Sequence, residues 1–550
     1  MSTQIPPELA ERIFAYLPPN DIACTARLVN KAAAAHFSGP QYTVVRLSLP
    51  VPEHAFKHHW GRPDATRGLI WDQRVTLVRL TARSGCIANL ELALDSTELP
   101  ISSSPSCQHA RRLFEVAAAA GQLEVCQWLQ QRGCDSSLAL SAAAEAGQRA
   151  VCEWGLAAGW PLTDLAVYAA ARGGQVGLLE WLLQLWPQDR PPVNAGTLLE
   201  SAAQGCELGV LKDLWEQHGE RLQGWETLDI MEGAACSLTP DWQAKVEWLE
   251  EHGAIKTHYI CDRATICPDA GERLRWLHAR GYPITAHQTY LAMKHNNLEA
   301  LRYLLQQGIR PSGRGAANGA AYSGNVAALE LLCYPADEVQ LRVAAQGGHM
   351  PAVISLMRRM GRNAPVELWG DEEVQRLLSV ELFDAAAKSG NMELMRWLRQ
   401  RGCPWGPGAV HGAAAAGWVE GLEWLVEQGC PMPESGSPYK EAAADSDMAT
   451  LRCLRRLGCP WGPHGKVFMN CIGQCEPSVL QFLLDEGCPV DWVAAVQTLA
   501  KWLAGSARGA QERWEWLRAS SGEVWWRQEG YTSVDAALQA ALEKARGEEE

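Results

Sequence analysis

The sequence has no long apolar run. Among its 550 residues, no stretch approaches the 18 or more consecutive apolar residues that a membrane-spanning helix requires. The first residues, MSTQIPPELAERIF, also lack the basic start and apolar core of a secretory signal. We therefore expect no membrane partner, and we expect the 18 cysteines to be reduced thiols in the cytoplasm or nucleus.

An excess of basic residues is absent too. Lys and Arg number 49 against 63 Asp and Glu, which gives a net charge of −14. Because phosphate contacts need a basic face, this balance predicts that nucleic acid is not a partner. Apolar residues make up 47% and charged residues 20% of the chain, which is ordinary for a packed globular protein.

No motif typical of a catalytic site is present. We find no GxSxG, no HExxH, no phosphate-binding GxxxxGK[ST] and no pair of motif-borne carboxylates. The pair His58-His59 has no Cys or carboxylate at ligand spacing, and the group around Cys261 matches no familiar zinc arrangement. We therefore expect no catalytic residue, no metal site and no cofactor, and a protein that is not an enzyme.

What the sequence does contain is an internal repeat, clearest between Ala385 and Pro431. Two copies of one pattern follow each other there: alanines, a glycine, Trp-Leu, then Gly-Cys-Pro, with Trp397 and Trp424 27 residues apart. A period of this size indicates a supersecondary unit that stacks on the next one. The pattern continues, with drift, over about thirteen units from residue 113 to residue 490. A weaker copy begins at Ala82.

Each unit predicts two helices. In the copy at Ala117, alanines end a first helix that a neighbour can approach closely, and Gly121 breaks it. The second helix carries Trp128 and Leu129 on its apolar side and ends at Gly133. The recurring tryptophans are therefore expected in the core, at Trp128, Trp154, Trp181, Trp248, Trp276, Trp397 and Trp424.

This unit resembles the ankyrin repeat, whose helical half has the same Ala-Ala-x-x-Gly…Leu-Leu-x-x-Gly skeleton. It departs from the family because the Thr-Pro-Leu-His opening is missing and the period is mostly 26 to 29 residues, shorter than the usual 33. The resemblance implies an all-α, ankyrin-like helical repeat solenoid with shortened fingers and a protein partner bound on it. Trp405 and Trp461 lie in the loops, outside the helical register, and are expected to anchor a partner. The alternative is that both fold back onto the next unit.

A small helical module is expected ahead of the repeats. Leu9, Ile13 and Leu17 fall at i, i+4 and i+8 of a first helix, and Asn20 or Asp21 can cap a second one. The stretch IPPELAERIFAYLPPNDIACTARLVNK resembles the N-terminal part of an F-box, the segment by which substrate receptors dock onto the Skp adaptor of SCF ubiquitin ligases. The docking face that this resemblance implies consists of Pro6, Leu9, Ile13, Phe14, Leu17, Ile22, Leu28 and Val29.

The expected domain order follows from these patterns. It is an F-box-like module at 1–37, a connector with a short strand near 42–49 at 38–80, a degenerate first repeat and Ser/Pro-rich linker at 81–112, the array at 113–490, and a C-terminal cap with an acidic tail at 491–550. The resemblances imply a non-catalytic protein-protein interaction protein. In this interpretation it is the substrate receptor of an SCF-type ubiquitin ligase, with a Skp-type adaptor and a cullin ligase as partners. The alternative is an ankyrin-type scaffold without a ubiquitin role, whose N-terminal helices only cap the first repeat.

Overall fold

The computed structural model consists of helices, turns and loops in the residues that it describes. These are residues 14, 16–101, 108–134, 136–219, 222, 225–311, 313–332, 334–361, 376–463, 465–504, 510–520 and 534–547. Within these ranges successive helices form pairs that stack on one another, so the expected all-α helical repeat array is confirmed. None of the helices in these ranges combines the length and apolar character that crossing a bilayer requires.

The chain divides into two compact units. Unit 1 comprises Met1–Ala117, Gln122–Asp135 and Gly406–Glu550, whereas unit 2 comprises Ala118–Gly121 and Ser136–Trp405. Unit 1 therefore combines segments from both ends of the sequence.

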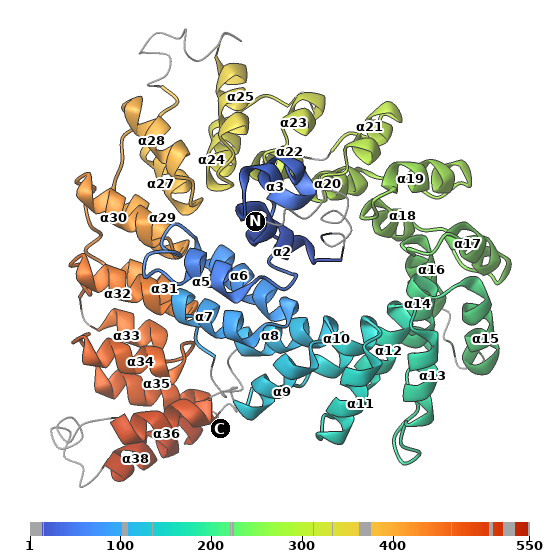
Figure 1. Ribbon diagram of the computed structural model, residues 1–550, viewed down its shortest axis with the longest axis horizontal. Coiled ribbons are helices and arrows are strands. Elements are labelled where there is room, and N and C mark those ends of the chain that lie inside the picture. The colour runs from blue at the N-terminus through green and yellow to red at the C-terminus, as the bar shows by residue number, and fades with distance from the viewer. Residues whose placement is uncertain are drawn as a thin grey trace, which may run out of the picture. The chain divides into compact units, whose positions relative to one another are not determined.

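Unit 2 is a stack of helix pairs. First helices pack against first helices of the neighbouring pairs, and second helices pack against second helices, so each kind lines its own side of the stack (Figure 1). The pairs are α10 (Ala139–Glu145) with α11 (Arg149–Ala157), α12 (Asp164–Arg172) with α13 (Val176–Gln184), α14 (Ala195–Gly205) with α15 (Leu208–His218), α16 (Glu226–Ala235) with α17 (Trp242–Glu251), α18 (His258–Thr265) with α19 (Ala270–Ala279), α20 (Ala286–Lys294) with α21 (Leu298–Gln306), α22 (Gly315–Tyr322) with α23 (Val326–Leu332), α24 (Glu338–Gln346) with α25 (Met350–Met360), and α27 (Val380–Lys388) with α28 (Met392–Gln400).

One pair shows why the repeated pattern folds in this way. In α12, Ala169 and its alanine neighbours are fully buried, and their small side chains allow the adjacent first helices to approach. Gly174 then turns the chain with φ +68°, and a Cβ there would lie 2.5 Å from the carbonyl oxygen of Gly205 in the next pair. The second helix α13 buries Leu179 and Leu182. The alanines, the glycine and the leucines of the repeat thus each have a packing role.

Polar side chains join successive pairs as well. The last carbonyls of a first helix have no partner within that helix. Asn297 Nδ2 of one pair donates to the carbonyl of Cys267 in the preceding pair at 2.9 Å. Arg273 donates to the carbonyls of Ala235 and Ser237 at 2.8 and 2.7 Å in the same way. These bonds satisfy buried carbonyls and fix the spacing between pairs.

Unit 1 contains the first helices of the chain and the last repeats. Its helices are α2 (Pro19–Cys24), the 3₁₀ helix η1 (Ala26–Leu28), α3 (Lys31–His36), α4 (Pro40–Thr43), α5 (Glu53–Trp60), α6 (Trp71–Ser84), α7 (Ile87–Thr97), α8 (Gln108–Ala119), α9 (Leu123–Gln131), α29 (Pro407–Ala415), α30 (Val419–Glu427), α31 (Ser437–Ala444), α32 (Met448–Arg456), α33 (Lys466–Cys471), α34 (Pro477–Asp485), α35 (Trp492–Ala504), α36 (Ala510–Ser520) and α38 (Val534–Gly547). The first repeat pair is α6 with α7, so it begins at Trp71, eleven residues before the expected start.

Within unit 1, α6 packs against repeats from the other end of the chain. Arg74 and Asp447 form a buried ion pair, with Nη1 to Oδ1 at 2.9 Å and Nη2 to Oδ2 at 2.5 Å. Arg74 also donates to the carbonyl of Gly417 at 2.6 Å, and the Trp71 amide donates to that of Ala416 at 2.8 Å. No sequence pattern connects residues that are 373 positions apart, so this contact was not expected.

Two structural expectations are wrong. The alternating segment at 42–49 forms no strand in the described residues; helix α4 and turns occupy it, and Asn20 satisfies its backbone. The recurring tryptophans are not core residues, because only Trp397 among them is buried and the others are half-buried. They lie on the second helices, where a cation often covers the ring: Arg132 lies 3.6 Å from the centroid of Trp128 and Arg401 lies 4.0 Å from that of Trp397. Except at Trp154, which Gly155 follows, the leucine after each of these tryptophans takes a core position, as Leu129 does.

Candidate binding surfaces

The described residues 14 and 16–60 form a small helical module, here called the N-terminal module. Its core is Ile22, Ala26 and Phe37, with Phe14 and Tyr42 packed against it. The rings meet edge to face, with centroids 5.0 Å apart for Phe14 and Phe37 and 5.1 Å apart for Phe37 and Tyr42. So small a core leaves much of the module's apolar surface uncovered.

Asn20 holds the module's long loop in place. Its side chain is fully buried and donates to the carbonyls of Arg46 and Pro50 at 2.8 and 2.9 Å, while its Oδ1 accepts from the Arg46 amide at 2.9 Å. Helix α2 begins with Pro19 at its first position, and Asn20 lies inside the helix. The helix cap is Pro18, so neither Asn20 nor Asp21 caps the helix as the sequence predicted. Asn20 instead bonds to the backbone of residues 46–50, as a neighbouring strand would.

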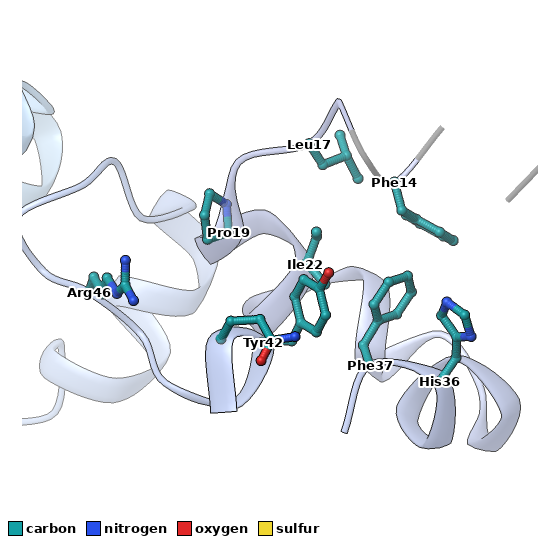
Figure 2. Close-up of a pocket in the computed structure, with 9 residues that line it drawn as sticks. Phe14, Leu17, Pro19, Ile22, His36, Phe37, Tyr42 and Arg46 are labelled. Carbon is teal, nitrogen blue, oxygen red and sulfur yellow. The ribbon is translucent and has the colours of Figure 1, made fainter. Parts of the chain in front are cut away.

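A cavity of about 460 Å³ opens beside this core, and Figure 2 shows the side chains around it. Phe14, Leu17, Ile22 and the Phe37 and Tyr42 rings supply apolar walls. The residues that line it are Phe14, Leu17, Pro19, Ile22, His36, Phe37, Gln41, Tyr42 and Arg46. Arg46 adds a guanidinium and His36 an imidazole to a lining of both polar and apolar atoms, which suits an apolar ligand with negative charge nearby.

A second cavity of about 610 Å³ lies on the same module. Its lining residues are Cys24, Leu28, Val45, Leu47, Val51, His54, Ala55, Phe56, His58, His59 and Trp60. Burial raises the pKa of the Cys24 thiol, and the charge of Asp21 raises it further, so this thiol is held in its protonated form. Across the described residues no group of three or more His, Cys, Asp or Glu side chains is placed to hold a metal ion.

Exposed apolar side chains concentrate on this module. Tyr16 is 90% exposed, Leu28 76% and Val29 71%, and Leu17, Val44 and Val45 are exposed as well. Isolated exposed hydrophobic residues need no explanation, but a group of this kind on one small module marks an interaction surface. The module is also locally basic: residues 14–60 hold four Lys and Arg against two Asp and Glu, a net +2 in a chain of −14.

The residues of the expected docking face divide into three groups. Pro6, Leu9 and Ile13 lie outside the described residues. Phe14, Leu17 and Ile22 line the first cavity, with Ile22 largely buried in the module's core. Leu28 lines the second cavity, and the neighbouring Val29 is exposed. The structure therefore places the described members around two cavities and not on one continuous helix face.

The loop tryptophans are engaged within the chain. Trp405 is half-buried, meets the Phe383 ring edge to face at 5.6 Å and has the Arg399 guanidinium 4.0 Å from its centroid. Trp461 is half-buried against Tyr439, with ring centroids 4.1 Å apart. Both rings fold back, but onto the helix pair that precedes them and not onto the next unit as the alternative had it. Each ring therefore keeps only part of its surface exposed.

Burial shifts the pKa values of several ionisable groups in the repeats. On the first helices of unit 2, burial raises the pKa of Glu200 and Glu232; Asp229 raises both further, while Arg263 lowers both. Burial likewise raises the pKa of Cys126 to about 12. A thiol whose pKa is raised is a poor nucleophile, so Cys126 behaves as a packing residue.

Comparison with known proteins gives no family. No family model matches the chain, and no curated protein shows significant similarity to it. The chain is similar to the solved pentatricopeptide repeat protein PPR10 from maize, with 12% identity over 97% of each chain and a TM-score of 0.27. It is also similar to PPR10 in complex with an 18-nt psaJ RNA element, with 13% identity over 99% of this chain and 96% of that chain and a TM-score of 0.21. Values this low carry no argument about what this chain binds.

These comparisons correct the family assignment. The interpretation as an F-box and ankyrin repeat protein finds no support, because no family model matches the chain and the similar solved structures are pentatricopeptide repeat proteins. Alanines before a glycine and leucines after it encode stacked helix pairs in general, which is why they resembled one such family. Three expected partners depended on that assignment: a protein on the array, a Skp-type adaptor and a cullin ligase. They lose their support together with it.

The comparisons do not support the exclusion of nucleic acid as a partner either, because two of the similar solved structures contain RNA bound to PPR10. The exclusion had a physical weakness too, because a net charge for the whole chain does not describe how charge is distributed along it.

Proposed function

We propose that this chain is a non-catalytic binding protein that docks a partner protein on its N-terminal module. A helical repeat array is a fold of binding proteins. The observation that supports the proposal most is the group of exposed apolar side chains on residues 16–45, next to two cavities.

The chemistry of the module indicates the kind of segment that fits. Its walls are apolar, its net charge is +2, and Arg46 and His36 line the first cavity. A partner segment with apolar side chains and flanking acidic residues would complement both properties. The buried thiols and the missing catalytic motifs favour binding over catalysis.

Proximity labelling in cells with the full-length chain tests this proposal. The Leu28→Asp/Val29→Asp double variant should lose a set of labelled proteins, because charge in the apolar contact is costly. Both residues are exposed, so folding should be unaffected, as thermal unfolding would verify. Leu185→Asp, at an exposed leucine in unit 2, is the matched control and should keep the set. An unchanged set in the double variant would refute the docking surface.

A further inference from the structure

Three consecutive first helices of unit 2 each expose one tyrosine. Tyr259 of α18 is 52% exposed, Tyr290 of α20 41% and Tyr322 of α22 55%. A first helix packs on its own second helix and on the first helices at either side, so its exposed side chains lie on the remaining open side. We call these three residues the tyrosine face.

The tyrosines follow a diagonal track across the three helices. Tyr259 is the second residue of α18, Tyr290 the fifth of α20 and Tyr322 the last of α22. With 1.5 Å of rise per residue and about 9 Å between packed helices, neighbouring tyrosines lie on the order of 10 Å apart. The track therefore fits an extended chain that presents a planar group at intervals.

Imidazole rings enlarge two of these aromatic positions. His258 lies with its ring centroid 4.0 Å from that of Tyr259. His287 is stacked on Tyr290 with a centroid distance of 6.2 Å and an interplanar angle of 19°, and its side chain is largely exposed. The first pair is tilted, with an interplanar angle of 35°, and His258 is half-buried. Each pair still contains an exposed tyrosine, and exposed aromatic rings are suited to stacking with a planar ligand group.

This part of the chain is also basic. From His258 to Tyr322 there are eight Lys and Arg against four Asp and Glu, a net +4 in a chain of −14. Helices α20 and α22 contain no acidic residue. Lys294 and Arg310 are exposed and lie in no ion pair within the described ranges. This segment of unit 2 therefore contains exposed cations as well as exposed rings.

We propose that the tyrosine face binds single-stranded nucleic acid. Bases stack on the three tyrosines, and Lys294 and Arg310 attract the phosphates. The acidic side chains Glu200, Asp229 and Glu232 on the neighbouring first helices α14 and α16 repel phosphate, so they limit the bound strand to α18 and the helices after it. This site consists of residues of unit 2 only, and the proposal does not rest on docking at the N-terminal module.

Fluorescence anisotropy with the full-length protein and labelled single-stranded RNA of about 12 nucleotides tests the proposal. The triple variant Tyr259→Ala/Tyr290→Ala/Tyr322→Ala should bind at least about tenfold more weakly because it loses base stacking. The matched control Tyr16→Ala removes an exposed tyrosine from the N-terminal module and should bind as the unchanged protein does. Lys294→Glu should weaken binding and reduce its dependence on salt.

Binding measurements with other ligands distinguish the proposed ligand from its alternatives. An RNA duplex should bind more weakly than the single strand, because its bases are not free to stack. No binding of single-stranded RNA or DNA at about 50 mM salt would overturn the proposal. Equal binding by the triple variant and the unchanged protein would also overturn it. The proposal would also be overturned if an acidic peptide displaced the oligonucleotide and the triple variant no longer bound that peptide. The ligand of the tyrosine face would then be a polypeptide.

Discussion

Asn20 shows what one buried polar side chain can do for a loop. Its amide and its Oδ1 pair with the backbone of residues 46–50, a segment whose alternating sequence would otherwise need a strand beside it. That arrangement holds the loop bearing Val45 and Arg46 next to the two cavities. A single residue 26 positions away thus decides the conformation of part of the candidate docking surface.

Asp384 carries a carboxyl group whose ionised form the fold disfavours. It lies half-buried on α27, and its Oδ1 is buried without a hydrogen-bond partner in the described part of the chain. Burial, together with the charge of Glu381, raises its pKa to about 6. Since the unfolded value is about 3.9, the folded state binds more protons between these two pH values, and stability falls as the pH rises through them.

Asp384→Asn should therefore stabilise unit 2 at neutral pH. Asparagine has nearly the same shape but does not ionise, so the gain at pH 7.5 should be about 1 to 2 kcal/mol, allowing for partial exposure. Below about pH 3 the aspartate is protonated in both states, and the gain should vanish. Urea unfolding at the two pH values measures the difference. A gain of the same size at both would show that the raised pKa is not its cause.

At the scale of elements, the helix pairs were predictable and their partners at long range were not. Alanines before a glycine and leucines after it predict two packed helices from local sequence alone, as α12 and α13 confirm. The tryptophans were misassigned because a half-buried ring covered by a cation four residues later, such as Trp128 under Arg132, looks in sequence like a core residue. Three members of the predicted docking face, Phe14, Leu17 and Ile22, do line one cavity.

The contact between α6 and the repeats near the C-terminus could not be predicted. It depends on Arg74 and Asp447, whose pairing no local periodicity encodes. Asp447 also accepts from the Thr450 amide at the start of α32, so one carboxylate serves a helix start and a contact between distant segments. Because both charges are almost fully buried, each depends on the other.

Removing one member of this pair should destabilise unit 1 strongly. Asp447→Ala leaves the Arg74 guanidinium buried without its counter-ion and should cost about 3 to 5 kcal/mol. Arg172→Met, at the exposed pair of Arg172 and Glu145, should cost at most about 1 kcal/mol. Denaturant unfolding of both variants makes the comparison. Similar losses for the buried and the exposed pair would contradict the role assigned to Arg74 and Asp447.

At the scale of the whole molecule, the net charge of the chain does not show where the candidate binding surfaces lie. The net charge of −14 hides a net +2 on the N-terminal module and a net +4 between His258 and Tyr322. The two basic segments belong to different units, the first with exposed apolar side chains and the second with exposed tyrosines. Local charge and local exposure together indicate one candidate binding surface on the N-terminal module and another on the repeats of unit 2.

Hydrogen exchange of the full-length protein, alone and with a partner captured by labelling, tests the central claim most directly. The account predicts slower exchange in residues 16–60 when the partner is bound, with helices α35 and α36 of the same unit unchanged. The Leu28→Asp/Val29→Asp variant should show no such protection. Protection confined to the repeats, with exchange in residues 16–60 unaltered, would contradict the claim that the N-terminal module is the docking surface.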